Sequence, residues 1–301
     1  MIKETQSISC YPVHGEKDMR WGLFVSTAGF QTIPAQEHYP PDDFPSTYSF
    51  NYQKGRILNE FQLVYITRGQ GVFQSASLDL VKVSEGNLLL LFPNEWHTYK
   101  PDEATGWEVY WVGFQGTQPS QLVREGFFEK NAPVINVGYR EDLVGLFQQL
   151  ISQAKQEETG FQQLIAGFIF HLLGLAFQKR QADHFEDKTM AKKMMKARMI
   201  IRQQAATITP ELLATELNVS YSWFRRSFKA YTGNSPAQYI TLIKIQQAKE
   251  LLETTGLTIT QIADQLHYTS PYYFSVSFKR TSGMTPGEYR KMAHGIPPKK
   301  K

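Results

Sequence analysis

Two stretches of the chain, FRRSFKAYTGNSPAQY at residues 224–239 and FSVSFKRTSGMTPGEY at residues 274–289, are closely similar to one another. Seven residues of the first recur at a spacing of 50 residues in the second: Phe224, Ser227, Phe228, Lys229, Gly233, Pro236 and Tyr239. Identities at one fixed spacing mark an internal repeat. The segment is therefore predicted to hold two copies of one small helical unit.

Each copy has the signals of two short helices joined by a tight turn. In the first, Thr209 has the place of an N-cap with Pro210 at the first helical position, and in the second Thr258 begins a capping box. Ala214 and Ala263 put a small side chain on the inward face of each first helix. A second helix can cross closely there, which predicts a helix-turn-helix in each copy.

The second helix of each copy is expected to begin at Ser220 or Ser270 and to bury two phenylalanines four residues apart. If it enters the major groove of DNA, its outward side chains reach base edges and phosphates. The candidate DNA-binding residues are Ser222, Arg225, Arg226, Lys229, Pro271, Tyr272, Tyr273, Ser275, Val276 and Lys279. Arg225 and Arg226 can donate paired hydrogen bonds to guanine, whereas Lys229 is placed for phosphate. The alternative is that these side chains form only a solvated helix surface.

The charge of the chain is divided unevenly along its length. Residues 190–301 carry 17 Lys and Arg against six Asp and Glu, whereas residues 1–189 carry 15 against 22. A basic C-terminal third is typical of a nucleic-acid-binding domain attached to something else, although surface charge can also be uneven without function. The helix predicted between the two copies, residues 236–253, would be about 27 Å long, close to the ~34 Å between successive major grooves. Both copies could therefore bind adjacent major grooves on one side of double-stranded DNA.

These residues resemble the AraC family of bacterial transcription regulators over about residues 193–292. The resemblance rests on Leu213, Ala214, Phe228, Lys229, Gly233, Pro236, Tyr239, Ala248, Leu252, Ile259, Ile262, Ala263, Phe274, Phe278, Lys279, Gly283, Pro286, Tyr289 and Arg290. It implies that the candidate residues contact DNA from two recognition helices. Departures from the family are a His267-Tyr268 pair in place of a Gly-Phe turn, Lys244 in place of a frequent arginine, and Val276 at an often basic position. His267 is expected to adopt a backbone conformation that glycine takes more easily.

The first half of the chain has the pattern of short strands. Apolar runs at residues 61–67, 72–73, 88–92 and 107–114 are separated by turn signals, among them Arg68-Gly69-Gln70-Gly71. Strands at such short spacing predict an antiparallel sandwich or barrel. The segment resembles the cupin sensor domain that precedes many AraC-type DNA-binding domains. The predicted fold class is α+β, with a cupin-like antiparallel β-barrel and a helical hairpin followed by an all-α double helix-turn-helix domain.

Aromatic residues are dense between Trp96 and Phe114, where they are interleaved with hydrogen-bonding side chains. Flat rings beside polar groups suit a sugar, and alternation puts Trp107, Val109 and Trp111 on one face of a strand. Resemblance to the family's arabinose-sensing domain implies ligand roles for an arginine, a tyrosine and a stacking tryptophan. The candidate ligand-binding residues are Arg56, His97, Tyr99, Trp107 and Trp111. The alternative is that these aromatics form only a barrel core and an interface.

The sequence predicts neither a metal site nor a cofactor. No second histidine follows His97 before His171, so the closely spaced ligands of a metal-dependent cupin are missing. We expect no catalytic residues, no metal and no cofactor. Cys10 is the only cysteine, which excludes an internal disulfide.

The predicted organisation has four parts. They are a ligand-sensing domain (1–136), a helical hairpin for dimerisation (137–182), a polar linker (183–190) and the DNA-binding domain (191–295). The longest apolar run, residues 164–177, is shorter than the ~18 residues of a membrane helix, and residues 1–12 have no signal-peptide core. A cytoplasmic, nucleoid-associated bacterial protein that does not enter a membrane is therefore expected.

The predicted function is sequence-specific regulation of transcription, as a ligand-responsive activator of a carbohydrate-utilisation operon. The expected partners are double-stranded DNA, a small-molecule effector that is a sugar, a second copy of the chain and RNA polymerase. Two alternatives stay open at this point. One is a cupin-type enzyme with an accessory DNA-binding domain, and the other is a DNA-binding regulator that needs no ligand.

Overall fold

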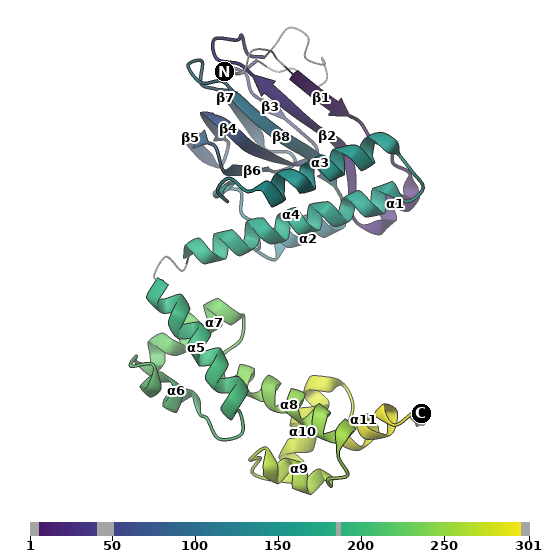
Figure 1. Cartoon of the computed structure of the whole chain (residues 1–301), viewed down its shortest axis with the longest axis vertical. Helices are drawn as coiled ribbons and strands as arrows, with labels where there is room; N and C mark the ends of the chain where they lie inside the picture. The colour runs from purple at the N-terminus through teal and green to yellow at the C-terminus, as the bar shows by residue number, and fades with distance from the viewer. Residues whose placement is uncertain (1–5, 41–50, 185–187, 296–301) are drawn as a thin grey trace. The chain divides into compact units, whose positions relative to one another are not determined.

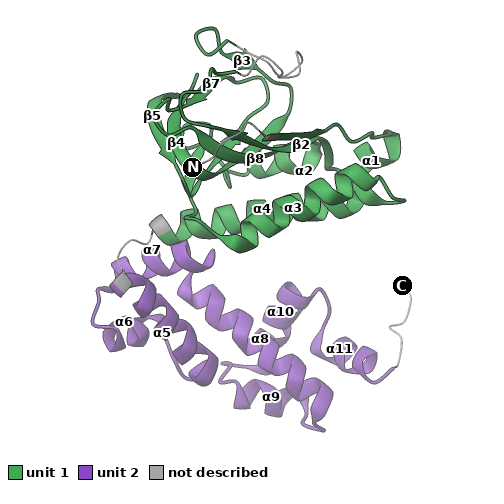
Figure 2. Cartoon of the chain, turned by 45° about the horizontal axis from the view of Figure 1, so that its top comes forward, with its two compact units in different colours: residues 1–184 green, residues 185–301 purple. Residues whose placement is uncertain are grey.

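The computed structural model describes residues 6–40, 51–184 and 188–295. The chain folds as two compact units, residues 1–184 and residues 185–301 (Figure 2). The first unit combines a β-sheet with helices, and the described part of the second consists of helices and their connections (Figure 1). This is the α+β class that the sequence predicts.

The strands of the first unit form an antiparallel sheet that folds over on itself. They are β1 (Gln6–Cys10), β2 (Phe24–Ile33), β3 (Arg56–Ile57), β4 (Phe61–Ser75), β5 (Leu78–Ser84), β6 (Asn87–Leu91), β7 (Trp96–Pro101), β8 (Trp107–Gln115) and β9 (Val134–Asn136). On one side the strand order is β1-β2-β8-β4-β6-β9. On the other side β4 pairs with β5 and β7, and β7 pairs with β3. The sheet thus encloses an interior, as a cupin-like barrel does.

β4 is the strand that turns the corner, and the prediction that a turn at residues 68–71 divides it is wrong. The strand runs unbroken for 15 residues and pairs first with β8 and β6, then with β5 and β7. Its register shifts between Ile66 and Arg68, where a bulge bends the strand. Gly69 has φ 82°, and a Cβ there would lie 2.2 Å from the carbonyl oxygen of Gly106. Glycine therefore carries the strand around the corner instead of ending it.

Alternation along β4 divides its side chains between two cores. Leu63 and Tyr65 belong to a core shared with the helices, whereas Val64 and Ile66 belong to the barrel interior. The helices of this unit are α1 (Glu16–Trp21), α2 (Thr117–Arg124), α3 (Glu141–Gln156) and α4 (Phe161–His184). α3 and α4 form the predicted helical hairpin and cover the outer face of the sheet (Figures 1 and 2). The inner face is left to line the barrel.

α4 is longer than its most apolar run, and residues 161–182 have the length and composition that could cross a membrane. The helix has another reason to be apolar. Ile165, Ile169, Leu172 and Leu173 are buried in the core that α4 shares with α3 and the sheet. These side chains stabilise the first unit by leaving water.

The second unit is built around one long helix. Its elements are α5 (Lys188–Gln204), α6 (Pro210–Glu216), α7 (Tyr221–Thr232), α8 (Pro236–Thr254), α9 (Ile259–Gln265), α10 (Pro271–Ser282) and α11 (Pro286–Ala293). α6 with α7, and α9 with α10, are the two helix-turn-helix units that the repeat predicts. Ile240 of α8 packs into the core of the first helix-turn-helix unit, whereas Ile245 and Leu252 pack into the core of the second helix-turn-helix unit. α8 ends at Thr254 with Thr255 as its C-cap, one residue beyond the predicted end at residue 253.

The sequence repeat is also a repeat of local geometry. The ring centroids of Phe224 and Phe228 are 5.3 Å apart, and those of Phe274 and Phe278 are 5.8 Å apart. All four rings are fully buried. Each half of the unit therefore has its own aromatic core under its second helix.

The turn of each helix-turn-helix holds a residue with a left-handed backbone. Asn218 has φ 52° and His267 has φ 53°. The conformation expected of His267 is therefore present, and glycine adopts it more easily than any residue with a side chain does.

The linker predicted at residues 183–190 is helical at both of its ends. α4 continues to His184 and α5 begins at Lys188. Residues 185–187, the remainder of that prediction, lie outside the described residues.

Candidate functional site

The two recognition helices, α7 and α10, each bury one face and expose the other. On α7, Arg225, Arg226 and Lys229 are exposed. On α10, Tyr272 is 73% exposed and Tyr273 is 63% exposed. The predicted DNA-binding side chains therefore lie on the surface of the second unit, on the face opposite the buried phenylalanines.

Caps fix the first turn of each recognition helix. Ser220 Oγ accepts a hydrogen bond from the backbone N–H of Trp223 at 3.4 Å, and Ser270 Oγ accepts one from Tyr273 at 3.2 Å. Pro271 lies in the first turn of α10, where its missing N–H costs nothing. Side chains near the N-terminus of a recognition helix are the ones that contact base edges. The caps therefore fix the backbone at the ends of α7 and α10 where the candidate residues begin.

The two recognition helices offer different chemistry. α7 presents three cations, of which Arg225 and Arg226 have the planar donor fork that matches guanine. α10 also exposes Lys279 and Arg280 in its last turn, but it has Ser275 and Val276 at the positions of Arg225 and Arg226. Val276 is 48% exposed, and the hydroxyl of Ser275 donates within the helix to Pro271 O at 2.9 Å. The first helix is suited to hydrogen-bonded recognition, and the second to apolar contact with bases.

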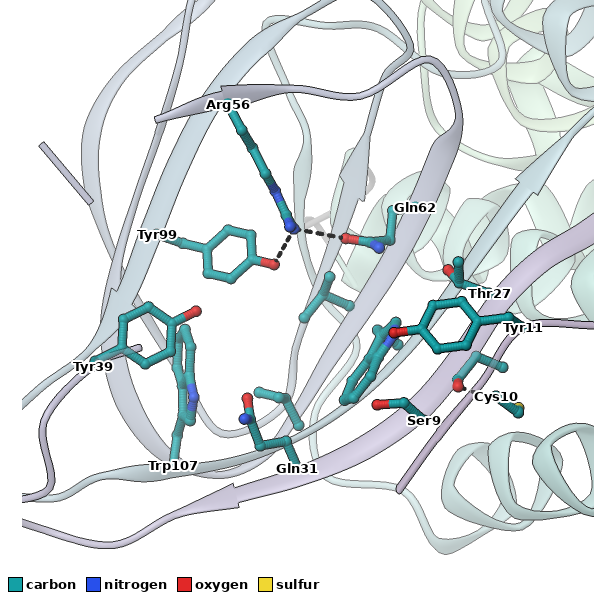
Figure 3. A pocket seen from close by; sticks show the side chains of 14 residues that line it. Ser9, Cys10, Tyr11, Thr27, Gln31, Tyr39, Arg56, Gln62, Tyr99 and Trp107 are labelled. Atoms are coloured by element: carbon teal, nitrogen blue, oxygen red, sulfur yellow. Dashed lines mark hydrogen bonds between the residues drawn. The ribbon is translucent and has the colours of Figure 1, made fainter. Parts of the chain in front are cut away.

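A pocket opens into the barrel interior of the first unit (Figure 3). The space between its lining side chains, which includes open solvent at the mouth, is about 570 Å³. Four of the five candidate ligand residues line it: Arg56, Tyr99, Trp107 and Trp111. Val109 lines it as well, so the face predicted from alternation along β8 is confirmed. The N-terminal segment also contributes, through Ser9, Cys10 and Tyr11.

Arg56 is fixed at one end of the pocket by a short strand pairing. β3 pairs with β7 so that Arg56 lies opposite His97. Its Nη2 donates to Tyr99 Oη at 2.6 Å and to Gln62 Oε1 at 3.4 Å (Figure 3). These hydrogen bonds fix the direction of the guanidinium, which brings a positive charge to the pocket.

His97 lies behind Arg56 and is not among the residues that line the pocket. It is 1% exposed, accepts from Arg56 Nε through Nε2 at 3.3 Å, and has Nδ1 at 3.1 Å from Glu95 O. Because an arginine can only donate, the imidazole proton belongs on Nδ1. Burial, and then the charge of Arg56, lower the pKa of His97 to about 4. His97 is therefore a neutral residue that holds Arg56 in position. The sequence predicted that it contacts the ligand.

A buried carboxyl group beside the pocket was missed by the sequence analysis. Glu60 is 3% exposed and accepts hydrogen bonds from Ser26 and Thr27. Burial raises the pKa of Glu60, while the bond from Ser26 and the charge of Arg56 act in the opposite direction. A Cβ at Gly113 would lie 2.3 Å from Glu60 Oε1, so the glycine makes room for the carboxyl.

Gln31 and Gln62 were also missed, although both line the pocket and are buried. Each is a polar residue inside an apolar strand, which is the signal that could have found them. In the described part of the chain, no three His, Cys, Asp or Glu side chains come together as a metal-binding group. What the pocket offers is aromatic rings, amides, hydroxyls and one guanidinium.

Two family models match the chain and cover most of both units. Residues 46–173 match the AraC-like ligand binding domain, and residues 213–292 match a helix-turn-helix domain. The chain belongs to the AraC family. The AraC-like ligand-binding match contains Arg56, Tyr99 and Trp111, and the helix-turn-helix match contains both recognition helices.

Relatives of this AraC-family chain are named as regulators of operons. The MmsAB operon regulatory protein of Pseudomonas aeruginosa is 26% identical over 77% of this chain and 75% of its own length. The lactose operon transcription activator of Staphylococcus xylosus is 26% identical over 80% and 86%. The arabinose operon regulatory protein of Escherichia coli is 28% identical over 79% and 80%. The chain is thus a DNA-binding regulator of transcription with a ligand-binding domain before its DNA-binding domain.

Proposed function

We propose that this AraC-type regulator binds a sugar in its barrel pocket and then activates transcription of a carbohydrate-utilisation operon. The observation that carries the proposal is the pocket itself, where a fixed arginine shares the lining with the rings of Tyr99, Trp107 and Trp111. Aromatic rings cover the C–H faces of a sugar, while arginine and amide groups bind its hydroxyls. Two of the relatives, the lactose and arabinose regulators, are named for sugar operons, which supports the same effector class.

The DNA-binding domain would bind two adjacent major grooves of one double helix. α8 has 19 residues, and a helix of that length spans about 28 Å, near the ~34 Å between successive major grooves. Arg225 and Arg226 would contact guanine, and Lys229 and Lys279 would contact phosphates. On α10, Tyr272 and its neighbours would contact bases through apolar surface.

Activation would require two copies of the chain. The contact between the two copies would be made by their hairpins of α3 and α4, where Leu164 is exposed. A sugar can shift the arrangement of the two DNA-binding domains only if it binds one arrangement more tightly than the other. The sugar-bound dimer would then assist RNA polymerase on the bacterial chromosome.

The test combines sugar binding with DNA binding. L-Arabinose, D-xylose, D-galactose, D-glucose and lactose are measured by calorimetry, and operator binding is measured with and without each sugar on a selected DNA site. At least one sugar is expected to bind and to strengthen operator binding. Arg56→Leu is expected to abolish the sugar response and to keep sugar-free DNA binding. Arg68→Leu is the matched control, because its side chain is 54% exposed and outside this pocket. If no sugar binds, or if Arg56→Leu responds as the wild type does, the effector proposal is wrong.

A further inference from the structure

One end of the pocket contains a buried hydrogen-bond donor that has no acceptor. Trp107 is 1% exposed, and its indole Nε1 has no hydrogen-bond partner among the residues that the structure describes. The ring lines the pocket, with the Tyr39 and Tyr99 centroids at 6.1 and 6.0 Å from its own. Buried donors without a partner are uncommon, because folding removes their hydrogen bond to water and no protein acceptor replaces it. The indole N–H therefore points to a group that arrives with the ligand.

Gln31 lies next to this donor. In the pairing of β2 with β8, Gln31 is opposite Val109 and Ile33 is opposite Trp107, which makes Gln31 and Trp107 diagonal neighbours on the pocket face. Gln31 is 4% exposed, and its side-chain amide is part of the pocket lining. Figure 3 shows the two side chains at the end of the pocket away from Arg56. A buried donor without an acceptor and a pocket-lining amide thus lie at the same end of the pocket.

A hydroxyl is the group that matches both. Its oxygen accepts from Trp107 Nε1, and its hydrogen can be donated to the amide oxygen of Gln31. An ammonium group cannot accept from the indole, and a carboxylate would be buried there without a cation. Among the described residues lining the pocket, the charged side chain is Arg56, at the other end. We propose that Trp107 and Gln31 form a hydroxyl subsite, and this rests on the proposed binding of a sugar.

The subsite sets a requirement on the effector. It needs a polar group near Arg56 and Gln62 and a hydroxyl near Trp107 and Gln31, with an apolar face between them for Trp111. A sugar ring carries hydroxyls on opposite edges and meets this requirement. A molecule with one polar end and a hydrocarbon tail leaves the second donor unpaired, which disfavours its binding.

The experiment uses calorimetry on the full chain with D-galactose, L-arabinose, D-xylose and D-glucose. For each sugar that binds, Trp107→Phe and Gln31→Met are expected to lower the affinity about 5- to 10-fold. Trp21→Phe is the matched control, because Trp21 is 58% exposed and does not line the pocket. Its affinity is expected to equal that of the wild type.

Deoxy analogues separate the hydrogen bond from the change in ring size. At one hydroxyl position of the sugar, removing the hydroxyl is expected to weaken binding to the wild type about 5- to 10-fold. Trp107→Phe is expected to bind this deoxy analogue and the parent sugar with equal affinity. If Trp107→Phe does not fold, the same comparison of sugar and deoxy analogue is made with Gln31→Met.

Three outcomes would overturn the subsite. A sugar that binds both variants and all deoxy analogues with unchanged affinity refutes the subsite and leaves the proposed function standing. Tighter binding of D-galacturonate than of D-galactose, with the same dependence on Trp107, assigns the donor to a carboxylate instead. Binding by no sugar overturns the proposed effector class, and the subsite with it.

Discussion

Replacing His97 by glutamine should make the first unit less sensitive to acid. In the folded protein, burial and then the charge of Arg56 lower the pKa of His97 to about 4, from 6.5. The unfolded chain therefore takes up a proton below pH 6.5 that the folded chain refuses. A group whose pKa is lowered by folding in this way contributes stability above its unfolded pKa, and the contribution is lost as the pH falls. For these two pKa values the loss between pH 7 and pH 5 is about 2 kcal/mol.

Glutamine keeps an acceptor for Arg56 and a donor for the Glu95 carbonyl but does not titrate. The assay is urea unfolding at pH 7 and pH 5, followed by tryptophan fluorescence. Four of the five tryptophans lie in the first unit, so the signal reports mainly its unfolding. Between pH 7 and pH 5, the free energy of unfolding of the wild type should fall by about 2 kcal/mol more than that of His97→Gln. The raised pKa of Glu60 acts with the opposite sign, but it affects both proteins and cancels in the difference. Equal losses in the two proteins would refute a neutral, buried His97.

Further changes test other parts of the account. Lys229→Ala should weaken operator and random DNA by the same factor and reduce the salt slope by about 1, measured by fluorescence anisotropy; a loss on the operator alone would contradict a phosphate contact. His267→Gly should stabilise the second unit in urea unfolding by about 0.5 to 1 kcal/mol, because it removes a left-handed side chain at φ 53°; a lower midpoint would contradict this. Gly113→Ala should lower the stability of the first unit by about 1 to 3 kcal/mol, since its Cβ would lie 2.3 Å from Glu60 Oε1. Gly145→Ala, whose Cβ meets nothing within 4 Å, is the control, and equal melting temperatures for the two alanine variants would argue against the clash.

The DNA-binding domain was predictable in detail because its signals are local. A cap and the helix it starts lie within a few residues of each other, as with Ser220 and Trp223. The phenylalanine pairs are four residues apart, and the second copy repeats the first. The left-handed backbone at His267 was also expected, because the family pattern has glycine there. Nothing in this unit required a long-range pairing to be known in advance.

The pocket was predictable only in part because distant strands build it. Alternation along β8 was enough to place Trp107 and Trp111 on one face. The position of His97 behind Arg56 depends on a two-residue pairing of segments 41 residues apart, which no local pattern reveals. Gln31 reaches the same end of the pocket through the pairing of β2 with β8. The break predicted at residues 68–71 was wrong because glycine marks a bulge as readily as a turn.

We propose that one chain binds two adjacent major grooves on the same side of DNA. Methylation-protection and hydroxyl-radical footprinting of the full chain on a selected operator test this directly. Each bound copy of the wild type should protect two patches about 10 base pairs apart on one side of the duplex. Replacing Arg225 and Arg226 by alanine should remove one patch, and replacing Tyr272 and Tyr273 by alanine should remove the other. A single patch, two patches on opposite sides, or loss of the same patch in both variants would contradict the account.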